Sequence, residues 1–172
     1  MKSTSSSDSL PFGKAFRKAG LKARAALVIS SWFGVGLVPK TPGTAGTAAA
    51  LPAVLLVHAA GPVGGFLVIL LFVLAAVWGA GETERALGRT DPREVVSDEV
   101  AGFMVTMFLL PFTWPYLVGG FILFRLFDII KPFPIRRLER FPGGAGVVLD
   151  DVAAGILANL ALQGAGALQA VI

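Results

Sequence analysis

The stretch FRLFDIIKPFPIRRLERFPGGAGVVLDD, residues 124–151, joins two apolar parts of the chain and is rich in charge. Arg125, Asp128 and Lys131 follow one another at three-residue spacing, ahead of two prolines, a glycine-rich turn and the adjacent Asp150-Asp151. Residues three apart are neighbours on a helix surface, so a continuous helix here would align the first three side chains along one flank. Charges grouped at the end of an apolar helix indicate a functional site.

Long uncharged segments flank this stretch. No Asp, Glu, Lys or Arg occurs between Lys40 and Glu82, between Glu99 and Arg125, or after Asp151. Hydrophobic residues make up 55% of the chain and charged residues only 15%, whereas soluble proteins have about 25% charged residues. The sequence therefore predicts an all-α, polytopic helical membrane protein. We expect about five spanning helices, each of roughly 20 apolar residues, and an interfacial or re-entrant N-terminal segment.

Residues 1–24 are expected to form a disordered and basic N-terminal segment, followed by a helical membrane domain over residues 25–172. Residues 1–9 are rich in Ser, which favours disorder. The segment PFGKAFRKAGLKARAAL, residues 11–27, has apolar residues on one helical side and five basic residues: Lys14, Arg17, Lys18, Lys22 and Arg24. This pattern predicts an interfacial amphipathic helix on an anionic leaflet.

Residues 25–38 form an apolar segment that is short for a span, and we interpret it as re-entrant or interfacial. The alternative is a signal peptide, with TAGTAAA, residues 44–50, as its cleavage zone. Nothing downstream has the composition of a secreted domain, so the first interpretation is favoured.

The rest of the chain alternates apolar runs and turns. Residues 48–60 and 62–80 predict two antiparallel helices, and residues 81–99 predict a polar loop. Residues 100–124 predict a helical hairpin that turns at LPFTWP, and residues 152–172 predict a last span. Gly155 would let a neighbouring helix approach that span closely.

Two polar segments carry candidate ligands. PKTPGTAGT, residues 39–47, places Thr44 and Thr47 before an apolar helix, where they would either help to bind an anion or simply cap the helix. Asp98 and Glu99 begin another apolar run, where the helix dipole favours carboxylates. The other acidic residues nearby alternate with arginines and are expected to form solvated ion pairs: Glu82, Glu84, Asp91 and Glu94 with Arg85, Arg89 and Arg93.

The expected topology returns four segments to one side of the membrane: residues 42–47, 98–99, 125–131 and 143–151. Five carboxylates then share one region: Asp98, Glu99, Asp128, Asp150 and Asp151. Clustered carboxylates repel one another unless a cation lies among them. Hard oxygen ligands select Mg²⁺, Mn²⁺ or Ca²⁺, and Mg²⁺ commonly binds one or two carboxylates together with substrate phosphates. The alternative is that these carboxylates only pair with arginines at a membrane interface.

Several mechanisms are excluded by composition. The chain has no Cys and a single His, at position 58. Thiolate nucleophiles, Cys metal sites and paired histidines are therefore absent. No motif supports nucleic-acid binding, and the net charge of +4 is better explained by contact with anionic lipid. The oligomeric state is left open.

Four stretches, taken together, carry a family resemblance: VPKTPGTAGT at 38–47, SDEVAG at 97–102, FRLFDIIKPFPI at 124–135 and GGAGVVLDDVAAG at 143–155. In these residues and in their order, the chain resembles the phosphatidylglycerophosphatase A family of bacterial membrane phosphatases. Thr47 stands where the family pattern leads us to expect Ser, which keeps the hydroxyl. All the acidic and glycine positions are present.

The resemblance implies Mg²⁺-dependent removal of the terminal phosphate from phosphatidylglycerophosphate, which leaves phosphatidylglycerol. It also implies a multi-pass protein of the bacterial inner membrane, and the positive-inside rule places the site on the cytoplasmic side. Without Cys or paired His, either a carboxylate attacks phosphorus or a metal-activated water does. We favour water, because no Asp lies in a recognisable phosphoacceptor motif.

Each candidate residue has an expected role. The expected metal ligands are Asp98, Glu99, Asp128, Asp150 and Asp151. The expected catalytic residues are Asp98, Asp128, Asp150 and Arg125. The expected substrate-binding residues are Gly43, Thr44, Gly46, Thr47, Arg125 and Lys131.

Three other functions compete with this one. Intramembrane carboxylates also occur in small ion-coupled transporters, where this cluster would be a cation site. A lipid transferase would also use Mg²⁺ and carboxylates, but the Asp-rich transferase signature is absent. A purely structural membrane protein would have no use for charges grouped at membrane depth.

Overall fold

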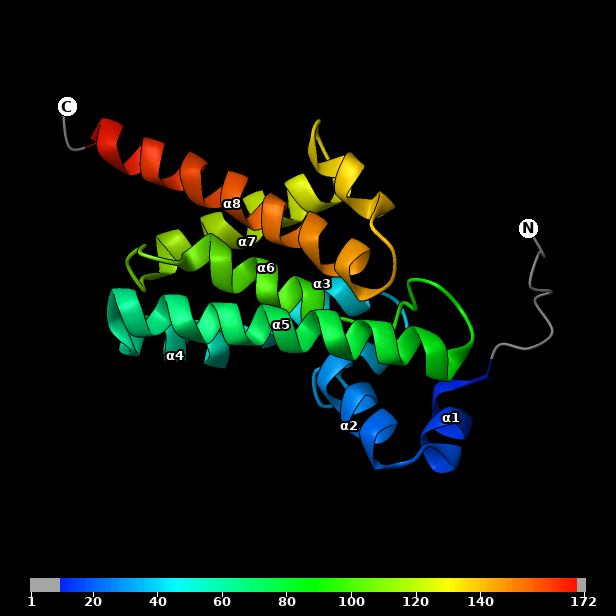
Figure 1. The fold of residues 1–172 in the computed structure, drawn as a ribbon. Helices are drawn as coiled ribbons and strands as arrows, with labels where there is room; N and C mark the ends of the chain where they lie inside the picture. The colour runs from blue at the N-terminus through cyan, green and yellow to red at the C-terminus, as the bar shows by residue number, and fades with distance from the viewer. Residues whose placement is uncertain (1–9, 170–172) are drawn as a thin grey trace.

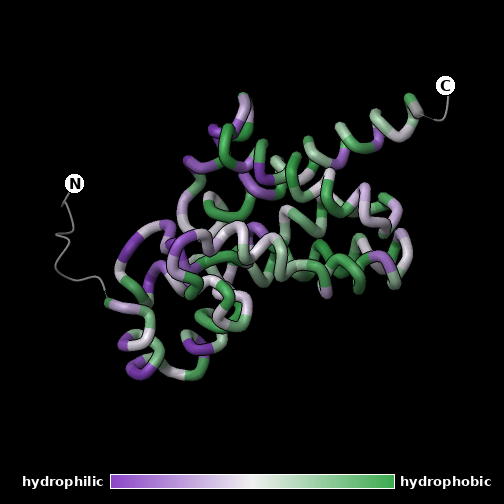
Figure 2. Tube along the Cα trace, turned by 180° about the vertical axis from the view of Figure 1, so that it is seen from behind, coloured by the Kyte–Doolittle hydropathy of each residue, from purple (hydrophilic) through white to green (hydrophobic). Residues whose placement is uncertain are grey.

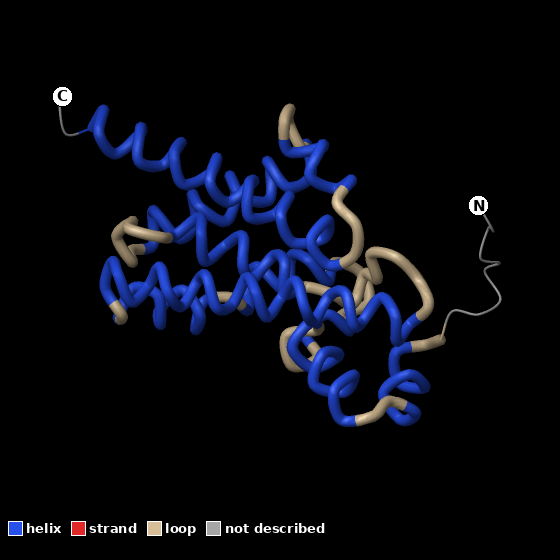
Figure 3. The backbone as a smooth tube through the Cα atoms, viewed as in Figure 1, coloured by secondary structure: helices blue, strands red, loops and turns tan. Residues whose placement is uncertain are grey.

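The computed structural model describes residues 10–169, and this part of the chain is helical and contains no strand (Figure 3). The prediction of an all-α fold is confirmed. The disorder expected for residues 1–9 concerns residues outside the described range. The helices are α1 (Phe12–Lys18), α2 (Leu21–Ser30), η1 (Val35–Leu37), α3 (Pro42–Ala49), α4 (Leu51–Ala59), α5 (Gly61–Leu87), α6 (Ser97–Met107), α7 (Trp114–Ile130), η2 (Ile135–Arg140) and α8 (Gly144–Gln169).

The long helices α5 and α8 run along the bundle, with α6 between them and α7 packed against α6 and α8 (Figure 1). Helix α4 packs along one end of α5, and α2 packs against the other end. The connections 88–96 and 131–143 lie at the same end of the bundle as α1 and α2. This end also carries most of the hydrophilic residues (Figure 2).

Three helical stretches are long and apolar enough to cross a membrane: Pro42–Ala59, Gly61–Leu87 and Gly144–Leu168. Helix α5 exposes a row of large apolar side chains, among them Val63, Phe66 and Leu71. A continuous row of exposed apolar side chains is unfavourable in water and favourable in lipid. The chain is therefore a membrane protein. We predicted about five spans, but only these three stretches are long and apolar enough among the described residues. Helix α6, for example, has only 11 residues.

Glycines allow α6 and α8 to pack closely. A Cβ atom on Gly102 of α6 would collide with the Phe124 ring and with the backbone oxygen of Asp151. A Cβ atom on Gly155 of α8 would collide with the backbone oxygen of Gly102. The sequence-based expectation that Gly155 permits a close helix contact is confirmed. The crossing lies about one helical turn from both carboxylate pairs, 98–99 and 150–151.

Some predicted boundaries are confirmed and others are wrong. The hairpin over residues 100–124 is present, with its turn between Met107 and Trp114. The last helix begins at Gly144 rather than at residue 152, and α5 continues to Leu87 before Gly88 ends it with a φ of 70°. In both places polar residues near the helix end hid its true boundary, and some of them, Glu84 of α5 and Asp150-Asp151 of α8, line a cavity.

Two further predictions at the start of the chain are wrong. The basic segment is not one amphipathic helix, since extended backbone at Ala19 and Gly20 divides it into α1 and α2. Residues 42–47 are not a loop, because α3 begins at Pro42, whose fixed φ suits a first helical position.

The α6–α8 crossing can be tested by adding one methyl group. Gly102→Ala should lower the free energy of unfolding by about 1–3 kcal/mol, because the new methyl group overpacks a buried contact. Gly164→Ala is the matched control, since a Cβ atom at Gly164 meets nothing within 4 Å. The control should be neutral or slightly more stable, by up to ~1 kcal/mol, because Ala favours helix. Unfolding of both variants in detergent measures the difference, and equal stabilities would contradict the packing described here.

Candidate active site

A cavity of about 370 Å³ opens at the polar end of the bundle. Its wall contains Asp98 and Glu99 from α6, Asp128 from α7, Lys131 after α7, and Asp150-Asp151 from α8. A second hollow of about 440 Å³ adjoins it and shares Asp98 and Glu99. The four segments expected to meet therefore contribute to two adjoining hollows, and three helices provide the five carboxylates that the sequence analysis singled out.

Three of the carboxylates form a close group. Each of Asp98, Glu99 and Asp151 offers an oxygen, and these oxygens all lie within 4.8 Å of one another. Asp98 and Asp151 are buried, with 8% and 4% of their surface exposed, and Glu99 is half-buried. Asp98 and Glu99 lie in the first turn of α6, where the helix dipole favours negative charge.

The donor chemistry of this group fits a divalent cation. Like charges at this separation repel one another unless a cation compensates them. Glu99 Oε2 is buried and has no hydrogen-bond partner, which leaves an acceptor available for a ligand. Three carboxylates without nitrogen or sulfur donors suit Mg²⁺, Mn²⁺ or Ca²⁺. Asp98, Glu99 and Asp151 are therefore candidate metal ligands.

The other two expected carboxylates lie beside this group and each pairs with a cation. Arg125 Nη1 lies 2.6 Å from Asp128 Oδ2 and 3.7 Å from Glu99 Oε1. Lys131 Nζ lies 2.5 Å from Asp150 Oδ2. Asp150 Oδ1 is buried without a hydrogen-bond partner. The five carboxylates are thus divided into a close group of three and two that are held by basic residues.

Lys131 has an unusual backbone. It ends α7 in the left-handed conformation, with φ of 46° and ψ of 63°, so the predicted helix through Lys131 ends one residue earlier. Its Nζ is held between Asp150 and Glu139, which lies 2.7 Å away. Burial disfavours the charged amine, but the hydrogen bonds to Asp150 and Glu139 outweigh burial and raise the Lys131 pKa. Lys131 therefore stays positively charged at neutral pH.

Helix α3 forms part of the second hollow through Gly43 and Thr44, beside Arg125. A Cβ atom on Gly43 would collide with Glu99 Oε1, so a larger residue at this position would displace a candidate metal ligand. The predicted capping of this helix by Thr44 or Thr47 is wrong, since Thr41 is the N-cap residue and forms no side-chain cap.

Gly46 and Thr47 lie behind the wall of the hollow. Thr47 is fully buried, and its Oγ1 donates a hydrogen bond of 2.9 Å to the Gly43 backbone oxygen. Gly46 packs against Val96, where a Cβ atom would be 2.7 Å from the valine Cβ. Gly46 thus lets α3 approach the start of α6, while the Thr47 hydrogen bond lies within α3 and holds the Gly43 carbonyl.

The cavity wall also includes acidic residues that sequence reasoning did not place there. Two expected ion pairs are present, Arg85 with Glu82 and Arg89 with Glu94, each at 2.6 Å. Glu84, Asp91 and Glu139 instead line the cavity. The Asp91 backbone N–H donates to Glu84 Oε1 over 2.9 Å. Their local sequence resembles that of solvated surface residues, so only the fold reveals their position.

The family of this chain is shown by comparison with known proteins. The family model described as phosphatidylglycerophosphatase A matches residues 28–165. This chain belongs to the phosphatidylglycerophosphatase A family. The resemblance drawn from the four sequence stretches is confirmed, and the chain is an enzyme of a lipid phosphatase family. The ion-coupled transporter alternative receives no support.

Three curated relatives cover most of the chain. Phosphatidylglycerophosphatase A of Escherichia coli is 36% identical over 73% of this chain and 74% of its own length. The protein of the same name from Haemophilus influenzae is 35% identical over 73% of this chain and 79% of its own length. A Bacteroides thetaiotaomicron protein with the provisional name phosphatidylinositol-3-phosphatase is 37% identical over 76% of this chain and 86% of its own length. No solved structure matches the chain.

Removal of one carboxylate tests the cation site. Mg²⁺ or Mn²⁺ should stabilise the wild-type protein against heat, by about 2.7 kcal/mol at a concentration 100 times the dissociation constant. Asp151→Asn should lose most of this gain, because it removes one charge from the close group. Glu82→Gln makes the same chemical change outside the group and should keep the gain. Thermal unfolding with metal and with EDTA measures this stabilisation. If metal stabilised Asp151→Asn as much as the wild-type protein, Asp151 would be excluded as a ligand.

Proposed function

We propose that this protein hydrolyses phosphatidylglycerophosphate to phosphatidylglycerol and inorganic phosphate, with Mg²⁺ as cofactor. The observation that carries this proposal is the group Asp98, Glu99 and Asp151, with its oxygens within 4.8 Å, beside Arg125 and Lys131. Such a site suits a phosphate monoester, because the carboxylates can hold a metal ion and the two basic side chains can bind the phosphate oxygens. Family membership favours a phospholipid as the molecule that carries this phosphate.

Asp98, Glu99 and Asp151 would hold the Mg²⁺ ion. When bound, this ion supplies positive charge that stabilises the transferring phosphoryl group. Asp150 precedes Asp151 and lines the same cavity. Its Oδ1 is buried and has no hydrogen-bond partner, so Asp150 would assist Asp151 in binding the ion. Hydrolysis of a phosphate monoester is extremely slow without catalysis, so such electrostatic stabilisation is essential.

Arg125 and Lys131 would bind the phosphate oxygens. Both are held by carboxylates, Arg125 by Asp128 and Lys131 by Asp150 and Glu139. Positioned cations of this kind stabilise charge as it develops in the transition state. Gly43 and Thr44 would contact the same phosphate from the start of α3, while Gly46 lets α3 approach the start of α6 and Thr47 holds the Gly43 carbonyl.

We infer that a water molecule attacks phosphorus, with Asp128 as general base. The Asp128 carboxylate accepts a proton from water as the new oxygen–phosphorus bond forms. The bond from phosphorus to the glycerol oxygen breaks, and the leaving oxygen takes up a proton from solvent water to become the alcohol of phosphatidylglycerol. Asp128 then returns its proton to solvent. The ion pair with Arg125 holds the Asp128 carboxylate in place, with 2.6 Å between Arg125 Nη1 and Asp128 Oδ2.

The site would face the cytoplasm in the inner membrane of a bacterium, in a protein that crosses the membrane several times. Basic residues gather near the cavity, namely Arg136, Arg137 and Arg140 of η2 together with those of α1 and α2. Cytoplasmic ends of membrane proteins carry an excess of Lys and Arg. This distribution supports a cytoplasmic cavity.

Phosphate release by the purified protein tests the proposal. We expect release from phosphatidylglycerophosphate, its loss with EDTA and its return with added Mg²⁺. Phosphatidylinositol 3-phosphate and phosphatidic acid are the comparison substrates, the first because of the name of one relative. Release from a comparison substrate but not from phosphatidylglycerophosphate would overturn the substrate assignment. EDTA-resistant release would overturn the metal requirement.

Asp150→Asn provides the matched variant for this assay. Loss of the charge that pairs with Lys131 should lower turnover by about 10²–10⁴-fold, the usual contribution of one positioned catalytic group. Asn keeps the side-chain size, so the variant should remain folded and inserted. Glu82→Gln should retain wild-type turnover. A wild-type rate in Asp150→Asn would remove Asp150 from the site.

A further inference from the structure

We propose that the hairpin formed by α1 and α2 docks on anionic phospholipid headgroups, on the side of the membrane where the cavity opens. This docking surface, called the basic hairpin below, comprises residues 12–30. The proposal concerns a surface outside the cavity, and it does not depend on which lipid the enzyme hydrolyses.

The basic hairpin has a one-sided charge. Residues 10–27 contain five basic residues and no acidic residue. Lys22 pairs with Glu82 at 2.8 Å, and Arg24 donates hydrogen bonds to the backbone oxygens of Phe16 and Arg17. The side chains of Lys14, Arg17 and Lys18 are exposed and form no ion pair within the described residues. Among the described residues, helix α1 therefore presents three positive charges without an ion-pair partner.

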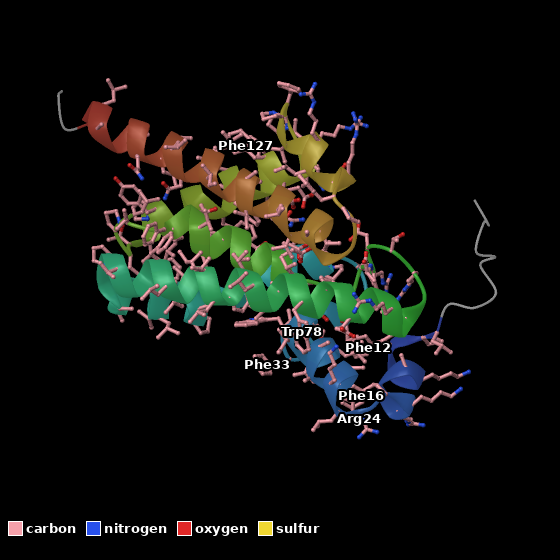
Figure 4. The ribbon with its side chains drawn as sticks, viewed as in Figure 1. Phe12, Phe16, Arg24, Phe33, Trp78 and Phe127 are labelled. Atoms are coloured by element: carbon pink, nitrogen blue, oxygen red, sulfur yellow. The ribbon has the colours of Figure 1, made fainter. Side chains whose placement is uncertain are left out.

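The basic hairpin is fixed to a membrane-spanning helix. Ala15 and Leu27 pack with Leu87 of α5 in a small apolar core. Ser30 and Thr83 share a hydrogen bond of 2.7 Å between buried hydroxyls. Figure 4 shows Phe12 beside the end of α5, and Phe16 and Arg24 together below it, by α1 and α2. Since α5 is one of the candidate spans, these contacts hold the basic hairpin close to the bilayer.

Exposed apolar side chains accompany the charges. Leu21, at the first position of α2, is 88% exposed, and Phe33, just after α2, is 75% exposed. Basic side chains next to isolated large apolar residues are typical of segments that lie in the membrane interface. The bilayer is also the surface nearest to a hairpin attached to α5. Charge and position together favour anionic lipid over a soluble partner.

Most of the basic hairpin lies outside the part of the chain that matches the family model. The family match begins at residue 28, so α1 and most of α2 precede it. The buried contacts of Leu27 and Ser30 join this additional part to the matched region. The basic hairpin is thus an addition to the part of the chain that contains the cavity.

A fluorescent label on α1–α2 tests the docking. The chain has no cysteine, so a single cysteine can be labelled selectively. Gly20→Cys is suitable because a Cβ atom there meets nothing within 4 Å, and Gly13→Cys is a second position for the same reason. The labelled full-length protein is placed in nanodiscs of phosphatidylcholine, with or without phosphatidylglycerol. Quenching by acrylamide, which is uncharged, then reports how far the label is exposed to water.

We expect the quenching constant to be about twofold lower in discs with phosphatidylglycerol, because the attraction between basic residues and anionic lipid holds the label in the interface. About 1 M salt should remove the difference, since the Debye length is then only about 3 Å. The triple variant Lys14→Gln, Arg17→Gln, Lys18→Gln should also remove it. A label at Gly164→Cys, where a Cβ atom likewise meets nothing within 4 Å, is the control and should not respond to the triple variant.

Two results would overturn the proposal. One is equal quenching in the two kinds of disc at low salt, for both label positions. The other is a difference that survives in the triple variant, which would assign the effect to another surface. Phosphate release by each labelled protein confirms that it is folded.

Discussion

The packing of α6 against α8 brings the carboxylates of Asp98, Glu99 and Asp151 close enough to repel one another. Like charges at 4–5 Å repel by roughly 3–4 kcal/mol per pair at an effective dielectric constant of about 20. Burial excludes much of the water that would otherwise screen them. The fold offsets this repulsion in part, through the N-terminus of α6 and through Arg125 close to Glu99. A divalent cation would offset the remainder, which makes this group a candidate metal site.

Close helix packing brings these charges together. The absence of side chains at Gly102 and Gly155 lets α6 and α8 cross about one turn from the carboxylates. Gly43 gives Glu99 room beside α3. Arg125 pairs with Asp128 and Lys131 pairs with Asp150, so these two carboxylates are held by basic residues beside the close group. The division between ligands and paired carboxylates suits a reaction in which separate groups hold the metal, the phosphate and the proton.

The sequence predicted the helical class, the hairpin after Asp98-Glu99 and the convergence of four polar segments, because uncharged runs and grouped charges are visible without a fold. It could not show that Asp150-Asp151 lie within α8, since a Gly-rich start looks like a turn until tertiary packing extends the helix. Nor could it show which carboxylates form the close group. The cavity positions of Glu84, Asp91 and Glu139 depend on contacts between distant segments. The local sequence around these acidic residues would be the same if they lay on an open surface.

If Asp98, Glu99 and Asp151 hold a metal ion at which the phosphate binds, phosphorus must lie next to that ion. Pulsed electron paramagnetic resonance can detect this neighbour in protein loaded with Mn²⁺ and a non-hydrolysable phosphonate analogue of the lipid. We expect a phosphorus hyperfine coupling to Mn²⁺ that is present in the wild-type protein and lost in Asp151→Asn. Tightly bound Mn²⁺ without any phosphorus coupling would instead mean that metal and phosphate occupy separate sites.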